Sequence, residues 1–293
     1  MLPAILVTGG TGQVGTAIER ENGGRFDVVA PARAELDLGD AGAITAMVAA
    51  RDWAAVINCA AYTAVDRAES EREAAFAVNA AAPGVIARAA AARGIPLLHV
   101  STDYVFDGTK AEPYREEDPV RPLGVYGASK EAGERAVREG NPRHIILRTA
   151  WVVSPWGANF VKTMLRLGAE RSELRVVADQ IGCPTGATDI ARALLIMAER
   201  LIADPDAPVG TYHFVNAGEA SWHALAEAIF AEVAAGGGAV PAVLPIPTSE
   251  YPTPAQRPMN SRLATDKIAR DYGIAARDWR AMVSEVVGEL RAG

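Results

Sequence analysis

Ala4-Ile-Leu-Val-Thr-Gly-Gly-Thr-Gly-Gln-Val-Gly15 is the stretch that decides the fold of this chain. The apolar run over 4–8 predicts a buried first strand, and the glycines that follow predict a tight turn into a helix. Glycines at such a turn let the backbone approach a pyrophosphate, while the helix N-terminus offers free N–H groups. We therefore expect Gly9, Gly12 and Gly15 to form a loop that binds the phosphates of a dinucleotide.

Short apolar runs alternate with longer helical patterns behind this turn. Strands are expected at 4–8, 27–30, 55–59, 97–101 and 144–148, and helices at 13–22, 41–50, 65–93 (with a break near Pro83) and 126–139. Such alternation implies right-handed βαβ units in a doubly wound parallel sheet with both faces covered. Residues 1–150 are thus predicted to form a Rossmann-like, NAD(P)-binding α/β domain.

The pattern loosens after Arg148. Helices are expected at 159–169, 188–203, 221–235 and 278–290, and strands at 174–177 and 212–215. Two segments, 179–186 and 245–262, are rich in proline, glycine and polar residues, and loops of this kind usually build the binding side of α/β enzymes. We expect 151–293 to form a smaller C-terminal α/β substrate-binding region, with about 170–210 returning to the first domain.

Composition limits the class of protein. The 293 residues carry a net charge of −7, which argues against a nucleic-acid-binding surface. The two cysteines, Cys59 and Cys183, have no metal-ligand spacing and are typical of a reduced, cytoplasmic protein. The N-terminus lacks the basic region of a signal peptide, and no apolar run is long enough to span a membrane. No metal site and no membrane partner are predicted.

The pattern Tyr126-Gly-Ala-Ser-Lys130 is the strongest catalytic signal. Residues at this spacing share one helix face, and a lysine there is expected to favour the phenolate of Tyr126, whose free pKa is roughly 10. A hydroxyl at Thr102, on a neighbouring strand end, could hydrogen-bond the same reacting oxygen. This short pattern also occurs by chance, but beside a dinucleotide loop it indicates that a carbonyl is reduced or an alcohol oxidised.

The choice between NADPH and NADH depends on the residues after the second strand, where NAD sites place an acid on the adenosine ribose. Here Arg33 could pair with a 2′-phosphate and Glu35 could take a ribose hydroxyl, or both could be solvated. We favour NADPH, with NADH as a second cofactor. Asp66 and Glu69, on the next long helix, are interpreted as a solvated face, and His99 as a hydrogen-bonded core residue.

Seven motifs occur in one order along the chain. They are Gly-Gly-Thr-Gly-Gln-Val-Gly15, Ala-Ala-Tyr-Thr-Ala-Val-Asp66, Ser-Thr-Asp-Tyr-Val-Phe-Asp-Gly108, Val-Tyr-Gly-Ala-Ser-Lys130, Leu-Arg-Thr-Ala-Trp151, Asp-Gln-Ile-Gly-Cys-Pro-Thr-Gly186 and Tyr-Pro-Thr-Pro-Ala-Gln-Arg-Pro-Met-Asn-Ser-Arg262. With them the chain resembles the dTDP-4-dehydrorhamnose reductases, which are extended short-chain dehydrogenases/reductases. The resemblance runs from the first strand to at least Arg262.

This resemblance implies NAD(P)H-dependent reduction of the 4-keto group of dTDP-4-dehydro-β-L-rhamnose to dTDP-β-L-rhamnose, the last step in making a precursor of lipopolysaccharide and other cell-surface polysaccharides. It also implies roles for individual residues. Phosphate contacts match Gly12, Gln13 and Val14; adenine contacts match Asp37 and Leu38; a cofactor-contacting triplet matches Ala61, Tyr62 and Thr63; the catalytic pair, which also touches cofactor, matches Tyr126 and Lys130; and substrate contacts match Thr102, Asp103 and Trp151.

Arg257 is an additional candidate for the substrate pyrophosphate, because nearby prolines limit its backbone freedom; a plain surface arginine is an equal alternative. Some family members are metal-bridged dimers held through glutamates, and Thr188 and Asp189 fall near one of those positions. The glutamates have no secure counterpart, so a role for Mg²⁺ stays open and a monomer or weak homodimer is expected.

Three alternatives remain. A nucleotide-sugar 4,6-dehydratase would place a glutamate after Thr102-Asp103, where this chain has Tyr104. A reductase or epimerase of another nucleotide-linked 4-keto sugar would use the same fold, and an epimerase would hold its NAD tightly. A non-catalytic subunit resembling the regulatory β subunit of methionine adenosyltransferase would have no need of the Thr102, Tyr126 and Lys130 set.

Overall fold

A computed structural model describes residues 1–292, and its centre is one parallel sheet. Its strands run in the order β10-β5-β4-β3-β1-β2, and every neighbouring pair is parallel. The bounds are β1 (Ala4–Thr8), β2 (Asp27–Val29), β3 (Ala55–Asn58), β4 (Leu97–Thr102), β5 (His144–Thr149) and β10 (Gly210–His213). The predicted Rossmann-like doubly wound sheet is confirmed.

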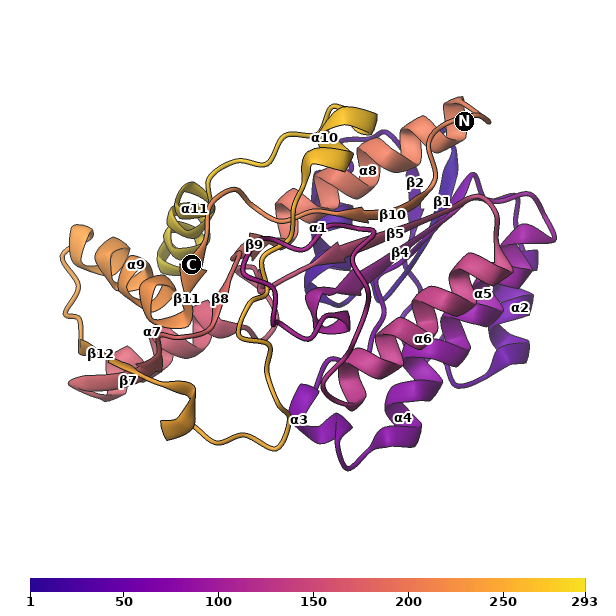
Figure 1. The fold of residues 1–293 in the computed structure, drawn as a ribbon. Coiled ribbons are helices and arrows are strands. Elements are labelled where there is room, and N and C mark those ends of the chain that lie inside the picture. The colour runs from indigo at the N-terminus through magenta and orange to yellow at the C-terminus, as the bar shows by residue number, and fades with distance from the viewer. Residues whose placement is uncertain (293) are drawn as a thin grey trace.

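Helices cover both faces of this sheet (Figure 1). On one face lie α1 (Gln13–Glu21) and α8 (Ala187–Ala203); on the other lie α2 (Ala41–Ala49), α5 (Ala82–Ala91) and α6 (Val125–Gly140). Alternate residues of β1 point to opposite faces, so Ile5 packs in the first core and Leu6 in the second. Such two-sided burial explains the continuous apolar strand sequences.

The strand order reverses between β1 and β3. Ligands of doubly wound sheets bind outside the carboxyl ends of the strands at such a point. In this chain the glycine turn follows β1, the segment Cys59–Thr63 follows β3, and Thr102 ends β4. The topology therefore gathers the sequence-predicted cofactor and catalytic segments at one edge of the sheet.

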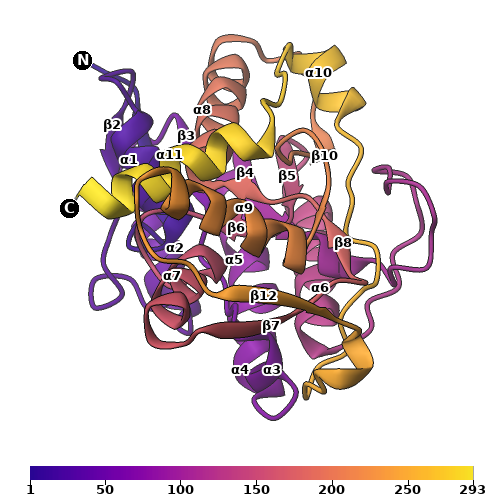
Figure 2. The ribbon, with the colours of Figure 1, turned by 90° about the vertical axis from the view of Figure 1, so that its left-hand side faces the viewer.

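The C-terminal part has a core of its own (Figure 2). This core joins side chains of β7 (Glu173–Val177), α7 (Phe160–Glu170), α9 (Trp222–Ala235) and α11 (Trp279–Ala292). Strand β12 (Ala242–Ile246) pairs with β7 in parallel. Two-residue strands complete this part: β6 (Val152–Val153) pairs with β9 (Thr185–Gly186), and β8 (Ile181–Gly182) pairs with β11 (Ala220–Ser221).

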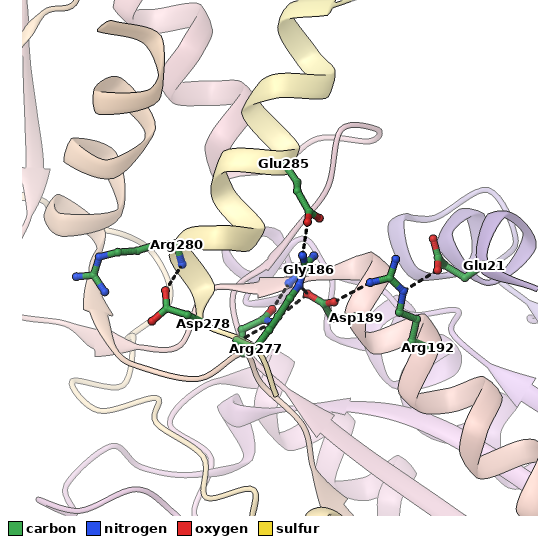
Figure 3. Close-up of polar contacts among 9 residues, drawn as sticks. Glu21, Gly186, Asp189, Arg192, Arg277, Asp278, Arg280 and Glu285 are labelled. Atoms are coloured by element: carbon green, nitrogen blue, oxygen red, sulfur yellow. Dashed lines mark hydrogen bonds and ion pairs between the residues drawn. The ribbon is translucent and has the colours of Figure 1, made fainter. Parts of the chain in front are cut away.

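A buried carboxylate ties the C-terminal part to helix α8 (Figure 3). Asp189, in the first turn of α8, accepts hydrogen bonds from Asn216 Nδ2 and Arg277 Nε, both at 2.9 Å. Arg277 also pairs with Glu285 of α11, while Arg192 lies 3.5 Å from Asp189. The negative charge is well placed at the N-terminus of a helix. This network fixes the start of α11 against α8.

Most predicted elements are confirmed within two residues, but the break in 65–93 was misplaced. Helix α3 (Val65–Ala68) stops before α4 (Arg72–Phe76), and near Pro83 the chain stays helical through a π-helical turn, η1 (Ala77–Ala81), leading into α5. Pro83 stands at the start of α5, where its missing N–H costs little. The expectation that no apolar run could span a membrane is wrong by length and composition, because Arg72–Ala91 is long and apolar enough. Its α5 part packs against α2 and α6.

Several short elements had not been predicted. They include α10 (Asp266–Tyr272), β12, the 3₁₀ turn η3 (Thr248–Glu250) and the four two-residue strands. A second 3₁₀ turn, η2 (Asp103–Val105), follows β4 directly and gives Asp103 and Tyr104 their positions beside α6.

Candidate active site

The glycine turn between β1 and α1 is shaped for the close approach of a ligand. Gly9 has φ +74°, a left-handed conformation that favours glycine. A Cβ on Gly15 would lie 2.3 Å from the carbonyl oxygen of Gly9, so a larger residue does not fit there. No side chain caps α1 at Gly12, which leaves the first N–H groups of the helix for an anion. These features fit a dinucleotide pyrophosphate.

Gln13 connects this turn to the C-terminal part. Its side-chain Oε1 accepts hydrogen bonds from Ser154 Oγ at 2.7 Å and Asn159 Nδ2 at 3.0 Å. Its backbone carbonyl accepts one from Trp156 Nε1 at 2.8 Å. The Gln13 side chain is already hydrogen-bonded, and the Val14 side chain is buried. Only the backbone N–H groups of Gln13 and Val14 are therefore available to bind a phosphate.

The three predicted catalytic residues meet where β4 ends and α6 begins. Thr102 ends β4, Tyr126 is the second residue of α6, and Lys130 follows one turn later. Thr102 lies close enough to the Tyr126 phenol to lower its pKa, while its own hydroxyl donates to Asp103 Oδ1 at 2.9 Å. A Cβ on Gly127 would lie 2.1 Å from the carbonyl oxygen of Tyr104. This glycine therefore allows α6 to approach the turn that follows Thr102.

Contrary to the expectation from spacing, Lys130 does not lower the pKa of Tyr126 in this structure. Burial raises the pKa of Tyr126 to about 12, while the nearby Thr102 hydroxyl lowers the pKa and the charge of Asp103 raises it. Lys130 Nζ instead donates to the carbonyl oxygen of Val100 at 2.8 Å. Tyr126 thus keeps its proton near neutral pH, which suits a proton donor.

Lys130 is almost fully buried. Burial lowers its pKa to about 8, although the charge of Glu134 acts in the opposite direction. Glu134 is itself buried and receives both Nε and Nη2 of Arg148, at 2.8 and 2.7 Å, together with the hydroxyl of Ser101. Because Arg148 already neutralises the Glu134 carboxylate, this carboxylate stabilises the Lys130 ammonium only weakly.

Asp103 is a buried carboxylate with an unused acceptor. Its Oδ1 accepts from Thr102 Oγ1 at 2.9 Å, whereas Oδ2 has no hydrogen-bond partner within residues 1–292. Burial raises the pKa of Asp103 to about 6, although the nearby hydroxyls of Ser261 and Thr102 act in the opposite direction. Leaving such an atom unpaired costs about 1–3 kcal/mol, so a ligand hydroxyl at Oδ2 would be stabilising. Next to it, the ring of Tyr104 meets that of Tyr126 edge-on at 5.4 Å.

Trp151 belongs to a rigid aromatic pair. Its ring stacks on Trp222 of α9, with 3.5 Å between the centroids and 10° between the planes. The ring also lies against Gly182, where a Cβ would come within 2.5 Å of it. Trp222 Nε1 donates to Gln180 Oε1 at 3.1 Å. Trp151 has φ +48°, unlike any other non-glycine residue in 1–292, and such strain is common at functional sites.

The predicted cofactor triplet Ala61, Tyr62 and Thr63 follows β3 at the same sheet edge. Asn79, in the π-helical turn η1, holds its middle residue: Oδ1 accepts from the Tyr62 N–H at 2.8 Å and Nδ2 donates to the Tyr62 carbonyl at 3.0 Å. The same Nδ2 donates to Ser129 Oγ of α6 at 2.9 Å. Asn79 thereby joins the triplet to the helix that carries Tyr126.

The residues predicted near the adenosine lie between β2 and α2. Arg33 and Asp37 are exposed, and Leu38 packs partly against the core beneath α2. Glu35 uses Oε2 to accept from the N–H of Ala32 at 2.7 Å. The guanidinium of Arg33 is therefore in reach of solvent at the rim of the site, as a 2′-phosphate contact requires.

Arg257 makes a bidentate ion pair with Asp66 of α3, at 3.1 and 2.9 Å, and both side chains are partly exposed. Glu69, one turn later, accepts from the N–H of Val125 at 2.8 Å. Both carboxylates are accessible to solvent, as interpreted, but each also has a partner: Asp66 holds the loop 251–262 and Glu69 holds the start of α6. The pyrophosphate role of Arg257 stays a prediction.

No three histidine, cysteine or acidic side chains within residues 1–292 gather so that they could hold a metal ion. Asp189, which falls near a metal-binding position of related proteins, is paired with Arg277 and Arg192 instead (Figure 3). Its neighbour Thr188 adds no charge. We assign no metal ligand.

Comparison with known proteins identifies the family. Residues 3–292 match the family model described as the RmlD substrate binding domain. A curated dTDP-4-dehydrorhamnose reductase of Sinorhizobium fredii is 45% identical over 289 residues, which are 98% of this chain and 97% of that protein. This chain belongs to the dTDP-4-dehydrorhamnose reductases.

Solved dTDP-4-dehydrorhamnose reductases share the fold over the whole chain. The crystal structure of one from Clostridium acetobutylicum has a TM-score of 0.91 and 37% identity, covering 98% of this chain and 99% of that one. Another, from Bacillus anthracis in complex with NADP, has a TM-score of 0.89 and 37% identity, covering 99% and 100%.

Sequence reasoning missed several residues of the reductase site. Trp222 gave no signal, because its partner Trp151 is remote in the chain. Asn79 lies in a run of alanines, where only an isolated amide marks it. His99 is a hydrogen-bonded core residue, as interpreted, but its approach to Lys130 could not be read from spacing.

Proposed function

We propose that this chain reduces the 4-keto group of dTDP-4-dehydro-β-L-rhamnose to dTDP-β-L-rhamnose, with NADPH as the hydride source. The observation that carries the proposal is the meeting of Thr102 and Tyr126 at the same sheet edge as the glycine turn. Trp151 follows β5 at that edge and supplies an apolar surface for a sugar. The curated relatives carry the corresponding enzyme name.

The residues divide the chemistry between them. NADPH, when bound, supplies the hydride. Reduction places negative charge on the carbonyl oxygen of the sugar, and Tyr126 donates its proton to that oxygen. Thr102 contributes a hydrogen bond to the developing charge. Lys130, as the ammonium ion, stabilises the tyrosinate that remains and contacts the cofactor ribose.

Binding of the sugar nucleotide involves three further residues in this proposal. Asp103 accepts a sugar hydroxyl at its unpartnered Oδ2. Trp151 packs its half-buried ring against the sugar. Arg257, released from or shared with Asp66, binds the pyrophosphate.

Cofactor binding is proposed to use the glycine turn and the backbone of Gln13 and Val14, with Ala61, Tyr62 and Thr63 against the ribose. Arg33 reads the 2′-phosphate, so NADPH is preferred and NADH is accepted less well; Asp37 and Leu38 contact the adenine. We further propose a monomer or weak homodimer that acts in the cytoplasm without a required metal.

One assay tests the reaction. The purified chain should oxidise NADPH in step with dTDP-4-dehydro-L-rhamnose and respond weakly to other 4-keto sugar nucleotides. Failure with the first and turnover with another would overturn the substrate while keeping a reductase. Tyr126→Phe should lower kcat by about 10²–10⁴-fold with folding intact. Tyr104→Phe, a matched change in the neighbouring ring, should stay near wild type; near-normal turnover of Tyr126→Phe would reject the assignment.

A further inference from the structure

A chain of buried polar side chains runs beneath the site from β1 to α6. Thr8 Oγ1 donates to Asn58 Oδ1 at 2.6 Å, and Asn58 Nδ2 lies 2.9 Å from His99 Nδ1. His99 Nε2 lies 3.4 Å from Lys130 Nζ. All four residues are at most 2% exposed. Nothing in the proposed chemistry so far uses Thr8, Asn58 or His99.

The donors around Asn58 decide how its amide is oriented. The backbone N–H of Ala60 can only donate, and it meets Asn58 Oδ1 at 3.2 Å, on the same atom that receives Thr8. The oxygen therefore faces these donors and the NH₂ group faces His99. His99 Nδ1 must accept this hydrogen bond, so the proton of the neutral ring is on Nε2.

The ring of His99 stays neutral because burial, with a smaller effect of Lys130, lowers its pKa well below the ordinary value. Its Nε2–H consequently points at Lys130 Nζ. An ammonium has only donors to offer in return, whereas a neutral amine has a lone pair that accepts. The contact thus stabilises the neutral form of Lys130 relative to the charged one.

We propose that His99 is a positioning residue that, held in one tautomer by Asn58, presents its Nε2–H to Lys130 and makes this lysine easier to deprotonate. The inference rests on the proposed role of Lys130. Its consequence concerns the end of each turnover, when Tyr126 has lost its proton. A lysine that gives up a proton readily can supply it: the proton leaves Nζ, the phenolate becomes a phenol, and the amine regains a proton from solvent.

The other groups that face Lys130 are few. On α6, Glu134 favours the ammonium, but Arg148 and Ser101 share its carboxylate. After β3, Cys59 is a neutral thiol, because burial raises its pKa to about 12. On β4, the Val100 carbonyl accepts one hydrogen from Nζ, which also favours the charged form. His99 is thus the one side chain among these that favours the neutral amine.

Nitrogen-15 NMR of the imidazole rings tests the tautomer without any turnover. The chain has four histidines, and loss of one set of signals in His99→Met identifies those of His99. In wild type the proton is expected on Nε2. Asn58→Asp, whose carboxylate can only accept, should move it to Nδ1. A wild-type ring protonated on Nδ1, or on both nitrogens, would overturn the inference even if the chain is an active reductase.

The pH profile of kcat separates this role from a structural one. Turnover should fall at high pH as Lys130 loses its proton. His99→Met removes the N–H and should move that fall upward by about one pH unit, which is a tenfold change in proton affinity. His99→Gln can accept from Asn58 and still present an N–H, so its profile should stay near that of wild type.

A matched control is His144→Gln. His144 is the first residue of β5, at the end of the strand away from the site, and it contacts the Asn141 carbonyl rather than Lys130. The proposal would be overturned if the high-pH decrease in kcat of His99→Met stayed at the wild-type pH. It would also be overturned if His99→Met and His99→Gln shifted that decrease equally. If His99→Met does not fold, the NMR comparison of wild type with Asn58→Asp still decides the tautomer. Because that arm needs no activity, it stands apart from the proposed function.

Discussion

The indole ring of Trp151 lies flat against that of Trp222, with 3.5 Å between their centroids. One ring follows strand β5 of the sheet and the other begins helix α9, so the contact joins the catalytic edge to the C-terminal part. Phe160 also packs against Trp222, with 4.8 Å between the ring centroids. Trp151 is therefore held by a stack and not by its own rotamer preference alone.

Trp222→Ala should lower kcat/KM for the sugar nucleotide while leaving the KM for NADPH unchanged. Loss of an aromatic pair of this kind is worth about 0.5–1.5 kcal/mol, or roughly a two- to tenfold decrease. Steady-state kinetics with each substrate varied in turn would measure it. Trp222→Phe keeps a stacking face and should recover most of the loss. An equal rise in both KM values would point to general unfolding of the site.

Arg257 and Asp66 can be separated by comparing single variants. If Arg257 binds the pyrophosphate, Arg257→Ala should raise the KM for the sugar nucleotide about tenfold or more, since a hydrogen bond to a charged group is worth about 1.5–3 kcal/mol. Asp66→Asn keeps Arg257 and should change this KM by less than about twofold, because their partly exposed ion pair is weak. Equal effects of the two substitutions would mean that the pair only anchors the loop.

Asp103 should make stability depend on pH. Its pKa rises from 3.8 unfolded to about 6 in the folded chain because of burial, so folding favours the protonated acid. The free-energy cost of burying the ionised carboxylate is absent below the unfolded pKa and grows as pH rises through the folded pKa. Above that pH it lowers the free energy of unfolding by at most about 3 kcal/mol.

Asp103→Asn removes this penalty. The variant should therefore gain stability over wild type at about pH 8 and little at about pH 4, measured by urea unfolding. It should also bind the sugar nucleotide less tightly, because the acceptor at Oδ2 is lost. A gain of the same size at both pH values would show that burial of the charge is not its cause.

Arg33→Ala should change the choice of cofactor. Loss of a charged contact to the 2′-phosphate should raise the KM for NADPH about tenfold and leave that for NADH nearly unchanged. The ratio of the two Michaelis constants, in wild type and variant, is the measurement. Arg51→Ala is a suitable control, because this exposed arginine also lies near the second strand but pairs with Asp27. An unchanged ratio in Arg33→Ala would remove Arg33 from the cofactor site.

The parts of the fold that could be predicted are those with a local signal. Strands β1, β3, β4 and β5 are continuous apolar runs, and the glycine turn marks where the first helix begins. Strand β12 was missed because it contains Pro245, and proline in a run of this kind argues against a strand; here it is tolerated on an edge beside β7. Helix α10 is short and carries four charged residues in seven, so no apolar period distinguishes it from a loop.

The residues of the candidate site also divide into those with a local sequence signal and those without one. Tyr126, Lys130 and the glycine turn could be predicted as site residues because each motif is contiguous. The contacts that modify them join distant segments: Asn79 to Tyr62, His99 to Lys130, and Trp222 to Trp151. The direction of the Tyr126 pKa shift was predicted wrongly for the same reason, since spacing gives the distance to a lysine but not the depth of burial.

The left-handed backbone at Trp151 sets two selective demands against each other. A β-carbon in that conformation is strained, and glycine or asparagine would relieve it. Either change would also remove the stack on Trp222 and the packing against two cores, and losing a packed tryptophan costs about 3–5 kcal/mol, more than the strain of about 1–3 kcal/mol. Selection for stability alone should therefore keep an aromatic side chain at this position in spite of its backbone.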